Sequence, residues 1–366
     1  METMNKRLIA INLPQFHPFK ENDEWWGKGF TEWTNVVRAR PRFRGHYQPH
    51  LPAETGFYDL RKPEARQMQA DLAQQHGIYG FCYYHYWFNG KQLMERPVNE
   101  ILTSGKPNFP FMLCWANENW TRAWDGGDKE ILIEQHYTKE DDIAHMNYLC
   151  KNIFSDPRYI RVNNRVFFAV YRPELFPNIQ ETVKTWREVA ASHDIELYLG
   201  FMRADNISRQ ALIDSGFDVS IDFQPHFILP RKWWLDINTL INCFRRRFLK
   251  KSPIMPTLWN YRKYTKKACQ DFERNIIKEF PGITPCWDNS PRRIGREFFA
   301  LKKSTPKLYE KWLKFLLNHF TSYSSEENFI FINAWNEWAE GCHLEPDQKW
   351  GRAYLEATKR AIETNI

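Results

Sequence analysis

The stretch FIFINAWNEWAEG, residues 329–341, holds the pattern that decides the fold. It begins with four apolar residues of the kind that fill a buried strand, and it ends with Glu337 and Glu340 among tryptophans. A short apolar run followed at once by polar and aromatic side chains is typical of a parallel strand whose carboxyl end carries a functional loop. The stretch therefore predicts a strand and, directly after it, a candidate site.

The same unit recurs along the 366 residues, since short apolar runs alternate with amphipathic stretches. This alternation indicates βα units and a parallel sheet. The predicted strands are residues 8–13, 80–86, 110–115, 166–171, 196–201, 218–223, 283–287 and 329–334. The predicted helices are residues 63–76, 138–154, 178–193, 208–215, 266–280, 306–320 and 353–364.

Eight such runs predict an α/β fold, a single (β/α)₈ TIM barrel over residues 1–366, with an open doubly wound sheet as the alternative. Two observations favour the barrel. The sequence LPQFHP, residues 13–18, follows the first run, where a dinucleotide-binding sheet would carry a glycine-rich fingerprint. Nearly every run also ends in polar or aromatic residues, which a barrel gathers at one mouth.

The first connection, residues 14–62, is too long for a simple turn and contains WWGKGFTEW, residues 25–33. Long loops in compact domains are either functional or disordered, and aromatic content argues against disorder. We therefore expect an elaborated first βα loop that contributes to the mouth of the barrel.

Tryptophan is unusually frequent, with 16 residues in a chain that is 43% hydrophobic and 26% charged. Large aromatics fill protein cores, so core packing is the plainer interpretation. Several tryptophans, however, stand beside Asn, Asp, Glu and Gly in WANENW (115–120), WDN (287–289) and WNEWAEG (335–341). Indoles next to hydrogen-bonding groups suit sugars, whose faces are apolar and whose rims are hydroxyls.

The amino-terminal apolar run is too short for a signal peptide, and no run is long enough to span a membrane. The seven cysteines are odd in number and form no CxxC pair. This pattern favours buried free thiols in a reducing cytosol and disfavours zinc. We therefore expect a cytoplasmic protein, at the inner face of the membrane if its basic segment docks there, without metal or cofactor.

That basic segment, residues 229–267, contains eleven Lys or Arg and one Asp, a net charge of +10 in a chain of net charge +7. It predicts a basic helical insertion after strand 6. Residues 237–251 read as an amphipathic helix that is either solvated or docked on an anionic membrane near lipid-linked saccharide. Nucleic acid is a weaker explanation, since no nucleic-acid-binding module is visible.

The two glutamates of WNEWAEG are the best candidates for catalysis. Work on a glycosidic bond requires a proton donor at the bridging oxygen and a second group at the anomeric carbon. A Glu-x-x-Glu pair is also common on solvated helices. Because this pair follows a strand, alternates with Trp335 and Trp338 and ends in Gly341, a site is the better interpretation.

At these residues the chain resembles a known family. WNEWAEG followed by LEP (344–346), together with LPQFHP, GFTEW (29–33), GFCYYHYW (80–87) and WANENW, is similar to the WbsX-like proteins of polysaccharide biosynthesis. These in turn are related to the endo-α-mannosidases of glycoside hydrolase family 99. The resemblance runs nearly the whole length and implies a (β/α)₈ barrel.

It also implies a metal-independent retaining mechanism on an α-glycosidic, mannoside-like linkage. In that chemistry Glu337 takes a proton from the sugar 2-hydroxyl, whose oxygen attacks the anomeric carbon to give a 1,2-anhydro sugar. Glu340 acts as the general acid and then as the base. The two carboxylates must therefore differ in environment, one ionised and one protonated.

The resemblance leaves the acceptor open. The expected cytoplasmic setting favours a glycosyltransferase or transglycosidase of surface polysaccharide or O-antigen assembly, acting on oligo- or polysaccharide that is either free or lipid-linked. An endo-acting hydrolase is the alternative, and a non-catalytic saccharide-binding barrel is the rival from another class.

Further candidates stand at the predicted strand ends. His85 either bonds a sugar hydroxyl or is structural, and Glu32, Asp222 and Asp288 are either supporting carboxylates or salt-bridge residues. Residues 291–293, PRR, either meet an anionic substrate group or are surface charge. The predicted substrate-binding residues are Gln15, His17, Glu32, Trp33, His85, Trp87, Trp115, Asn117, Glu118, Asn119, Trp120, Asp222, Trp287, Asp288, Trp335, Asn336 and Trp338.

Overall fold

The computed structural model describes residues 6–122, 127–202, 207–226, 256–294 and 297–364. Its main sheet has the strand order β12-β10-β9-β8-β4-β2-β1-β15-β13, with every neighbour along this order parallel. These strands are β1 (Arg7–Asn12), β2 (Ile78–Phe88), β4 (Phe111–Trp115), β8 (Arg165–Val170), β9 (Leu197–Met202), β10 (Val219–Ile221), β12 (Glu279–Phe280), β13 (Gly282–Ile283) and β15 (Phe329–Ile332).

The two ends of this order meet, because only Pro281 separates β12 from β13. Proline has no N–H to donate to a ladder, so it divides one strand into two short pieces. Ile221 of β10 pairs with Phe280 on one side of the break, and Ile332 of β15 pairs with Ile283 on the other. The parallel sheet thus closes into a barrel, and the predicted α/β barrel fold is confirmed.

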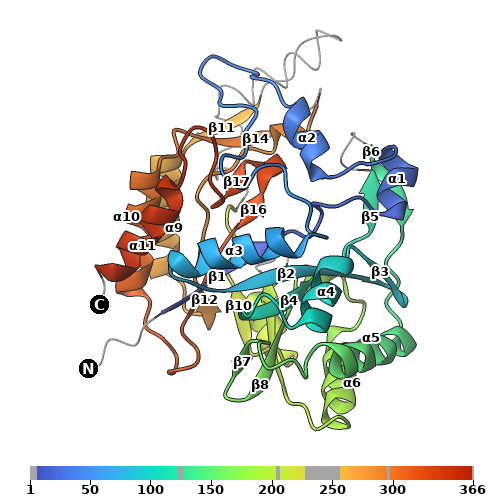
Figure 1. Cartoon of the computed structure of the whole chain (residues 1–366). Coiled ribbons are helices and arrows are strands. Elements are labelled where there is room, and N and C mark those ends of the chain that lie inside the picture. Colours follow the sequence, from blue (N-terminus) through green and yellow to red (C-terminus); the bar gives the residue numbers. More distant parts are fainter. Residues whose placement is uncertain (1–5, 123–126, 203–206, 227–255, 295–296, 365–366) are drawn as a thin grey trace, which may run out of the picture.

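Helices follow the strands and lie outside the sheet, with α9, α10 and α11 together on one side and α5 beside α6 on another (Figure 1). Several begin where the sequence supplies a cap: the side chains of Thr138, Asn178 and Thr305 accept a backbone N–H of the first turn. The helices that follow barrel strands are α3 (Pro63–Gln75), α4 (Arg96–Ser104), α5 (Lys139–Asn152), α6 (Ile179–Ala191), α7 (Arg209–Asp214), α9 (Tyr261–Glu273), α10 (Pro306–His319) and α11 (Ala353–Glu363).

Smaller elements decorate the connections. The long first loop contains the two short helices α1 and α2, as expected of an elaborated connection. The remaining elements are α1 (Lys20–Trp26), α2 (Glu32–Arg38), β3 (Lys91–Leu93), β5 (Trp120–Arg122), β6 (Gly127–Ile133), β7 (Arg161–Val162), η1 (Pro173–Leu175), β11 (Thr257–Asn260), η3 (Ser290–Arg292), β14 (Phe299–Lys302), β16 (Asn336–Glu337), η4 (Trp338–Glu340) and β17 (Cys342–His343).

Phenylalanines fill the barrel interior and connect its far sides. The ring of Phe167 on β8 lies 5.9 Å from that of Phe280 on β12 and 5.7 Å from that of Phe329 on β15. Phe280 and Phe329 are themselves 5.4 Å apart. All three side chains are fully buried, so the barrel is a packed core and not a pore.

Two predicted elements were misplaced around the seventh strand. The helix expected at 266–280 begins at Tyr261 and ends at Glu273, and the strand expected at 283–287 occupies 279–283. The polar pair Lys278-Glu279 conceals the start of this strand, and the apolar run after Ile283 belongs to the rim. Helix α4 was not predicted.

No described helix is both long enough and apolar enough to cross a membrane. The predicted basic insertion at 229–267 falls largely outside the described residues, and its candidate membrane-docking helix, 237–251, does so entirely. Only the end of this segment is seen, where Thr257–Asn260 forms β11 beside β14 and leads into α9.

Candidate active site

The two candidate catalytic glutamates lie on a small hairpin directly after β15. Asn336 pairs with His343, and Glu337 pairs with Cys342, in the antiparallel strands β16 and β17. The side chain of Asn336 accepts the backbone N–H of Leu13 at 2.7 Å and is itself fully buried. This contact fastens the hairpin to the end of β1, at the carboxyl edge of the barrel.

Gly341 makes the turn that sets the direction of Glu340. Its φ is +54°, in the left-handed region that side chains disfavour, and a Cβ there would lie 3.0 Å from the Cβ of Asp288. The backbone N–H of Asp288 donates to the carbonyl of Glu340 at 2.6 Å. The backbone around Glu340 is therefore held on both sides.

One guanidinium joins three carboxylates from two segments, the first loop and the hairpin after β15. Arg292 on η3 places Nη2 2.7 Å from Glu337 Oε2 and 2.7 Å from Glu32 Oε1, and places Nη1 2.6 Å from Glu340 Oε1. The exposed fractions of these side chains are 14% for Arg292, 0% for Glu32, 6% for Glu337 and 21% for Glu340. Glu340 is thus the carboxylate most open to solvent.

Burial raises the pKa values of two carboxyl groups in this cluster, Glu337 and Glu32. It raises the pKa of Glu337 to about 8, with Arg292 acting against the shift and Glu340 adding to it. Burial likewise raises the pKa of Glu32 to about 7. Burial alone would lower the pKa of Arg292, but its three carboxylate neighbours outweigh this and raise it. At neutral pH the cluster therefore carries fewer than three negative charges.

The cluster opens into a cavity of about 360 Å³, here called the mouth cavity. Its wall combines aromatic rings with a few polar groups, which is the composition of a saccharide site. The lining residues are Leu13, Tyr84, Tyr86, Ala116, Glu118, Asn119, Trp120, Thr121, Tyr171, Phe223, Trp287, Asn289, Arg292, Arg293, Glu337 and Glu340. Most follow the carboxyl ends of barrel strands, so the predicted convergence of strand ends occurs.

The chain matches the family model described as "Glycosyltransferase WbsX" over residues 8–358. The chain belongs to the WbsX glycosyltransferase family. This family consists of carbohydrate-active enzymes, and the resemblance stated from the sequence motifs is confirmed.

Curated relatives and solved structures agree with this assignment. The WbsX-family chain is 40% identical over 366 residues to the uncharacterized protein WxcX of two strains of Xanthomonas campestris pv. campestris. These matches cover 99% of this chain and 50% of each relative, so the chain spans about half the length of the curated relatives that it matches.

Among solved structures, the chain is similar to a glycoside hydrolase-like protein (TM-score 0.60, 12% identity, 99% of this chain and 95% of that one). It is also similar to the GH99 endo-alpha-mannosidase from Bacteroides thetaiotaomicron (TM-score 0.57, 13% identity, 99% and 98%). At these identities the similarity shows a shared barrel fold.

Six of the residues predicted from the WbsX sequence line the mouth cavity: Glu118, Asn119, Trp120, Trp287, Glu337 and Glu340. Glu118 pairs with Arg172, with 2.6 Å between Oε1 and Nη1, and Asn119 accepts the backbone N–H of Gln135. Glu32 reaches the cavity through its contact with Arg292. Residue 292, predicted to meet an anionic substrate group or to be surface charge, instead neutralises the protein's own carboxylates.

The tryptophans of WNEWAEG are core residues. Trp335 and Trp338 are both 0% exposed, and neither lines the mouth cavity. Trp338 stacks on His343 with 3.8 Å between ring centroids and donates its Nε1–H to Glu345 at 2.6 Å. Trp33 packs on Trp338. Other side chains cover the ring faces of Trp335 and Trp338, so these two indoles pack beneath the hairpin in the core and are not available to a substrate.

Strand alternation divides the GFCYYHYW segment between two faces. Tyr84 and Tyr86 line the mouth cavity, whereas His85 and Trp87 point to the opposite face. There the Nε2 atoms of His85 and His145 lie 2.9 Å apart, and Trp87 donates to Asp141 at 2.9 Å. Side chains alternate between the two faces of a strand, so the sequence of β2 already indicated that Tyr84 and Tyr86 share one face and His85 lies on the other. The sequence analysis chose His85 as the site residue and did not consider the tyrosines.

Trp115 and Asn117 also lie behind the cavity wall. Trp115 packs edge-on against His145, 4.6 Å between ring centroids. The amide of Asn117 donates to the carbonyl of Arg172 at 2.8 Å and accepts its N–H at 2.8 Å. Asn117 therefore joins the ends of β4 and β8 instead of meeting solvent.

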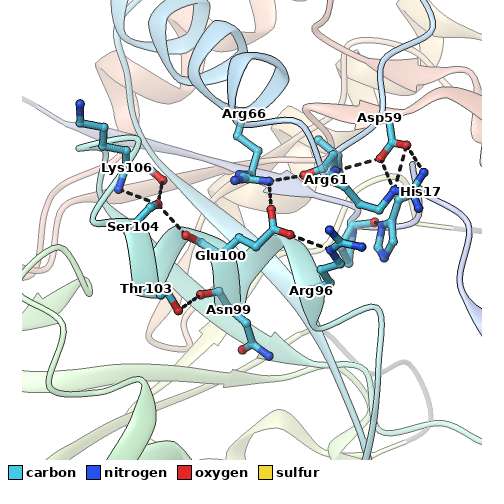
Figure 2. Close-up of polar contacts among 12 residues, drawn as sticks. His17, Asp59, Arg61, Arg66, Arg96, Asn99, Glu100, Thr103, Ser104 and Lys106 are labelled. Carbon is cyan, nitrogen blue, oxygen red and sulfur yellow. Dashed lines mark hydrogen bonds and ion pairs between the residues drawn. The ribbon is translucent and has the colours of Figure 1, made fainter.

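The two polar residues of LPQFHP are buried beside the first loop. His17 places Nδ1 2.9 Å from the carbonyl of Pro14, and burial lowers its pKa to about 4. Figure 2 shows His17 beside the ion pair of Asp59 and Arg61. Gln15 is fully buried. Neither residue lines the mouth cavity, so both fit a structural role better than substrate contact.

The remaining carboxylates are paired elsewhere. Asp222 contacts His226 Nε2 at 2.5 Å and Gln224 at 2.9 Å. Asp288 accepts from Gln48 at 2.7 Å and contacts His46 Nε2 at 2.5 Å. Burial alone would raise the pKa of Asp288, but the hydrogen bonds from His46 and Gln48 outweigh this effect, so the pKa of Asp288 is lowered. Asp288 lines a second cavity next to the first.

Proposed function

We propose that this chain is a retaining glycosyltransferase that acts on an α-glycosidic, mannoside-like linkage of a lipid-linked oligo- or polysaccharide during surface polysaccharide assembly. One observation carries the proposal. Glu337 and Glu340 both line an aromatic-walled cavity at the strand ends, and both contact the same arginine. Family membership supports glycosyl transfer as the reaction class.

The proposed first step forms a 1,2-anhydro sugar. Glu337, as a carboxylate, takes the proton of the 2-hydroxyl, and the 2-oxygen attacks the anomeric carbon. Glu340, as a carboxylic acid, protonates the departing glycosidic oxygen as its bond to carbon breaks. The pKa of Glu337 is raised to about 8, so the carboxylate that this step needs predominates only above that pH, where it is a stronger base than an ordinary glutamate and suits a weakly acidic hydroxyl.

The second step reverses these roles. Glu340 takes a proton from the acceptor hydroxyl, whose oxygen attacks the anomeric carbon. The bond from that carbon to the 2-oxygen breaks, and Glu337 returns the proton to the 2-oxygen. Two inversions give net retention. Arg292 stays between the carboxylates as a positioning residue that limits their mutual repulsion.

Hydrolysis is the second candidate function, because the side chain of Glu340 is 21% exposed and accessible to water. The two functions differ in the acceptor, which is a sugar hydroxyl in transfer and water in hydrolysis. The test supplies activated α-mannosides with and without a range of acceptor sugars and identifies products by mass spectrometry. Products that require the acceptor support transfer, and a free reducing sugar formed in water supports hydrolysis.

The glutamates are tested by Glu337→Gln and Glu340→Gln. Each is expected to lower kcat by at least about 100-fold, the usual scale for acid–base residues. Glu310→Gln, on the outer helix α10, is the matched control and keeps wild-type turnover. If both site variants turned over like wild type while still binding glycan, the chain would instead be a saccharide-binding barrel.

A further inference from the structure

A second cavity, here called the histidine cavity, lies beside the mouth cavity and shares Trp287 with it. Its volume is about 540 Å³. Its wall is drawn from the first loop, from β14, from the end of the β16–β17 hairpin and from the segment after it. The proposed glycosyl transfer uses none of its ionisable residues.

Three ligand-type side chains converge in this wall: His50, His343 and Asp347. His50 Nδ1 lies 2.9 Å from His343 Nε2, and a carboxylate oxygen of Asp347 lies within 4.8 Å of both. All three residues are buried, at 8%, 3% and 3% exposure. In the part of the chain that the structure describes, they form the one group of this kind.

The surrounding bonds prepare these atoms for coordination. His343 Nδ1 lies 2.9 Å from the carbonyl of Glu345, which only accepts, so Nδ1 carries the hydrogen and Nε2 keeps its lone pair. One oxygen of Asp347 accepts the backbone N–H groups of Lys349 at 3.1 Å and Trp350 at 2.6 Å. The carboxylate is therefore fixed in place, as ligating carboxylates usually are.

The three side chains offer a set of donor atoms that is common in metal sites. Two neutral imidazole nitrogens and one carboxylate are the donors that zinc and similar ions take in three-ligand sites.

We propose that His50, His343 and Asp347 bind one divalent transition-metal ion of the zinc class. Tetrahedral zinc places its ligand atoms about 3.3 Å apart, so binding needs a small separation of the two rings, whose nitrogens lie 2.9 Å apart, and a similar approach of the Asp347 oxygen, which lies within 4.8 Å of both. The fourth position faces the histidine cavity and takes water or an anionic oxygen, which the exposed Lys302 and Lys303 at its rim favour.

The ion would tie the first loop to the hairpin that carries the candidate catalytic glutamates. His50 belongs to that loop, and His343 is the partner of Asn336 in the hairpin. The sequence prediction of no zinc rested on the lack of closely spaced cysteine and histidine pairs. His50 and His343 stand 293 residues apart and meet only through the fold.

A plain N–H···N hydrogen bond is the competing explanation of the close histidines, and the chain contains an internal reference for it. His85 and His145 are also buried with 2.9 Å between their nitrogens, yet among the residues that the structure describes no metal-ligating group of three includes them. If the proposal is correct, metal binding depends on His50 and His343 and does not depend on His85 and His145.

The experiment uses untagged full-length protein stripped with a chelator and then titrated with Zn²⁺ or Co²⁺. We expect about one ion per chain by elemental analysis, a cobalt absorption spectrum of low-coordinate nitrogen–oxygen ligation, and a rise in the thermal unfolding midpoint with zinc. His343→Gln and Asp347→Asn are expected to weaken binding at least about 100-fold, and His85→Gln to leave it unchanged.

Two results overturn the proposal. One is folded wild-type protein that takes up no stoichiometric ion and shows no zinc-dependent midpoint, which leaves the hydrogen bond as the explanation. The other is unchanged affinity in His343→Gln and Asp347→Asn. If these variants do not fold, the cobalt spectrum of wild type decides, because a spectrum without low-coordinate histidine ligation rejects the site.

Discussion

Arg292 determines the state of the candidate active site at the scale of single residues. It is the cation among three buried or half-buried carboxylates, and each of them would repel the others without it. Removing one partner of a buried charge cluster costs more than the cluster contributes, because the remaining charges stay buried and unpaired. The penalty depends on pH, since a protonated carboxyl has no charge to leave unpaired.

We expect Arg292→Gln to lower the free energy of unfolding by about 3–5 kcal/mol at a pH above 8 and by much less near pH 5. The variant raises the carboxyl pKa values in the folded state, so its penalty appears as those groups ionise. Urea unfolding at both pH values measures it. Arg360→Gln removes a surface pair with Glu310 and costs at most about 1 kcal/mol at either pH. An equal loss for Arg292→Gln at both pH values would contradict the account.

The β16–β17 hairpin is the element on which the candidate chemistry depends. Its turn at Gly341 has a left-handed backbone and stands against Asp288, so a side chain there meets both strain and contact. Gly90, between β2 and β3, has φ +82° with nothing within 4 Å of an added Cβ. The two glycines separate the effect of backbone strain from the effect of moving the hairpin.

Both Gly341→Ala and Gly90→Ala are expected to destabilise the fold by about 1–2 kcal/mol through the left-handed backbone. Only Gly341→Ala should also lower turnover, because contact with Asp288 displaces Glu340. Thermal unfolding and kcat of the two variants provide the comparison. Wild-type kcat in Gly341→Ala would show that the turn does not position the glutamate.

The element scale also shows what the sequence could predict. Apolar runs such as 329–334 gave the strands, and WNEWAEG gave the two glutamates, because each signal is local. The pairing of Glu337 and Glu340 with Arg292 and Glu32 was not local and could not be read. The tryptophans misled for a related reason: Trp335 and Trp338 stand beside polar residues in sequence but are packed by Trp33, Phe81 and His343 in space.

At the scale of the whole molecule, buried ionisable groups set how stability depends on pH. Burial lowers the pKa of His50 and His85 to about 3 and of His17 to about 4, from 6.5. A group with a lowered folded pKa stabilises above its unfolded pKa and loses that contribution as pH falls. These histidines therefore make the folded state less stable as pH drops below 6.5.

Buried glutamates act in the opposite direction. Burial raises the pKa of Glu337 to about 8 and of Glu32 and Glu345 to about 7, from 4.5. A raised folded pKa contributes stability below the unfolded value and loses it as pH rises through the folded value. These groups make the folded state less stable from pH 4.5 upward until pH 8.

Together the two sets predict a maximum of stability between pH 4.5 and 6.5 and a decline from 6.5 to 8, where only the glutamates still titrate. Thermal unfolding midpoints of metal-stripped protein across this range test it. Glu337→Gln removes one titrating group, so its decline above pH 6.5 should be shallower than that of wild type. A wild-type midpoint that rises from pH 6.5 to 8 would show that the assigned shifts have the wrong sign.

The contact of Arg292 with both glutamates has a consequence for inhibitors. Sugar mimics with a positively charged ring nitrogen owe much of their affinity for glycoside-processing enzymes to unpaired active-site carboxylates. Here a guanidinium already supplies that positive charge, so a cationic mimic meets a site that is largely compensated. Neutral mimics that carry a strained three-membered ring across carbons 1 and 2 match the proposed intermediate in shape and need not displace the arginine. They are therefore the better starting point for chemical probes of this protein.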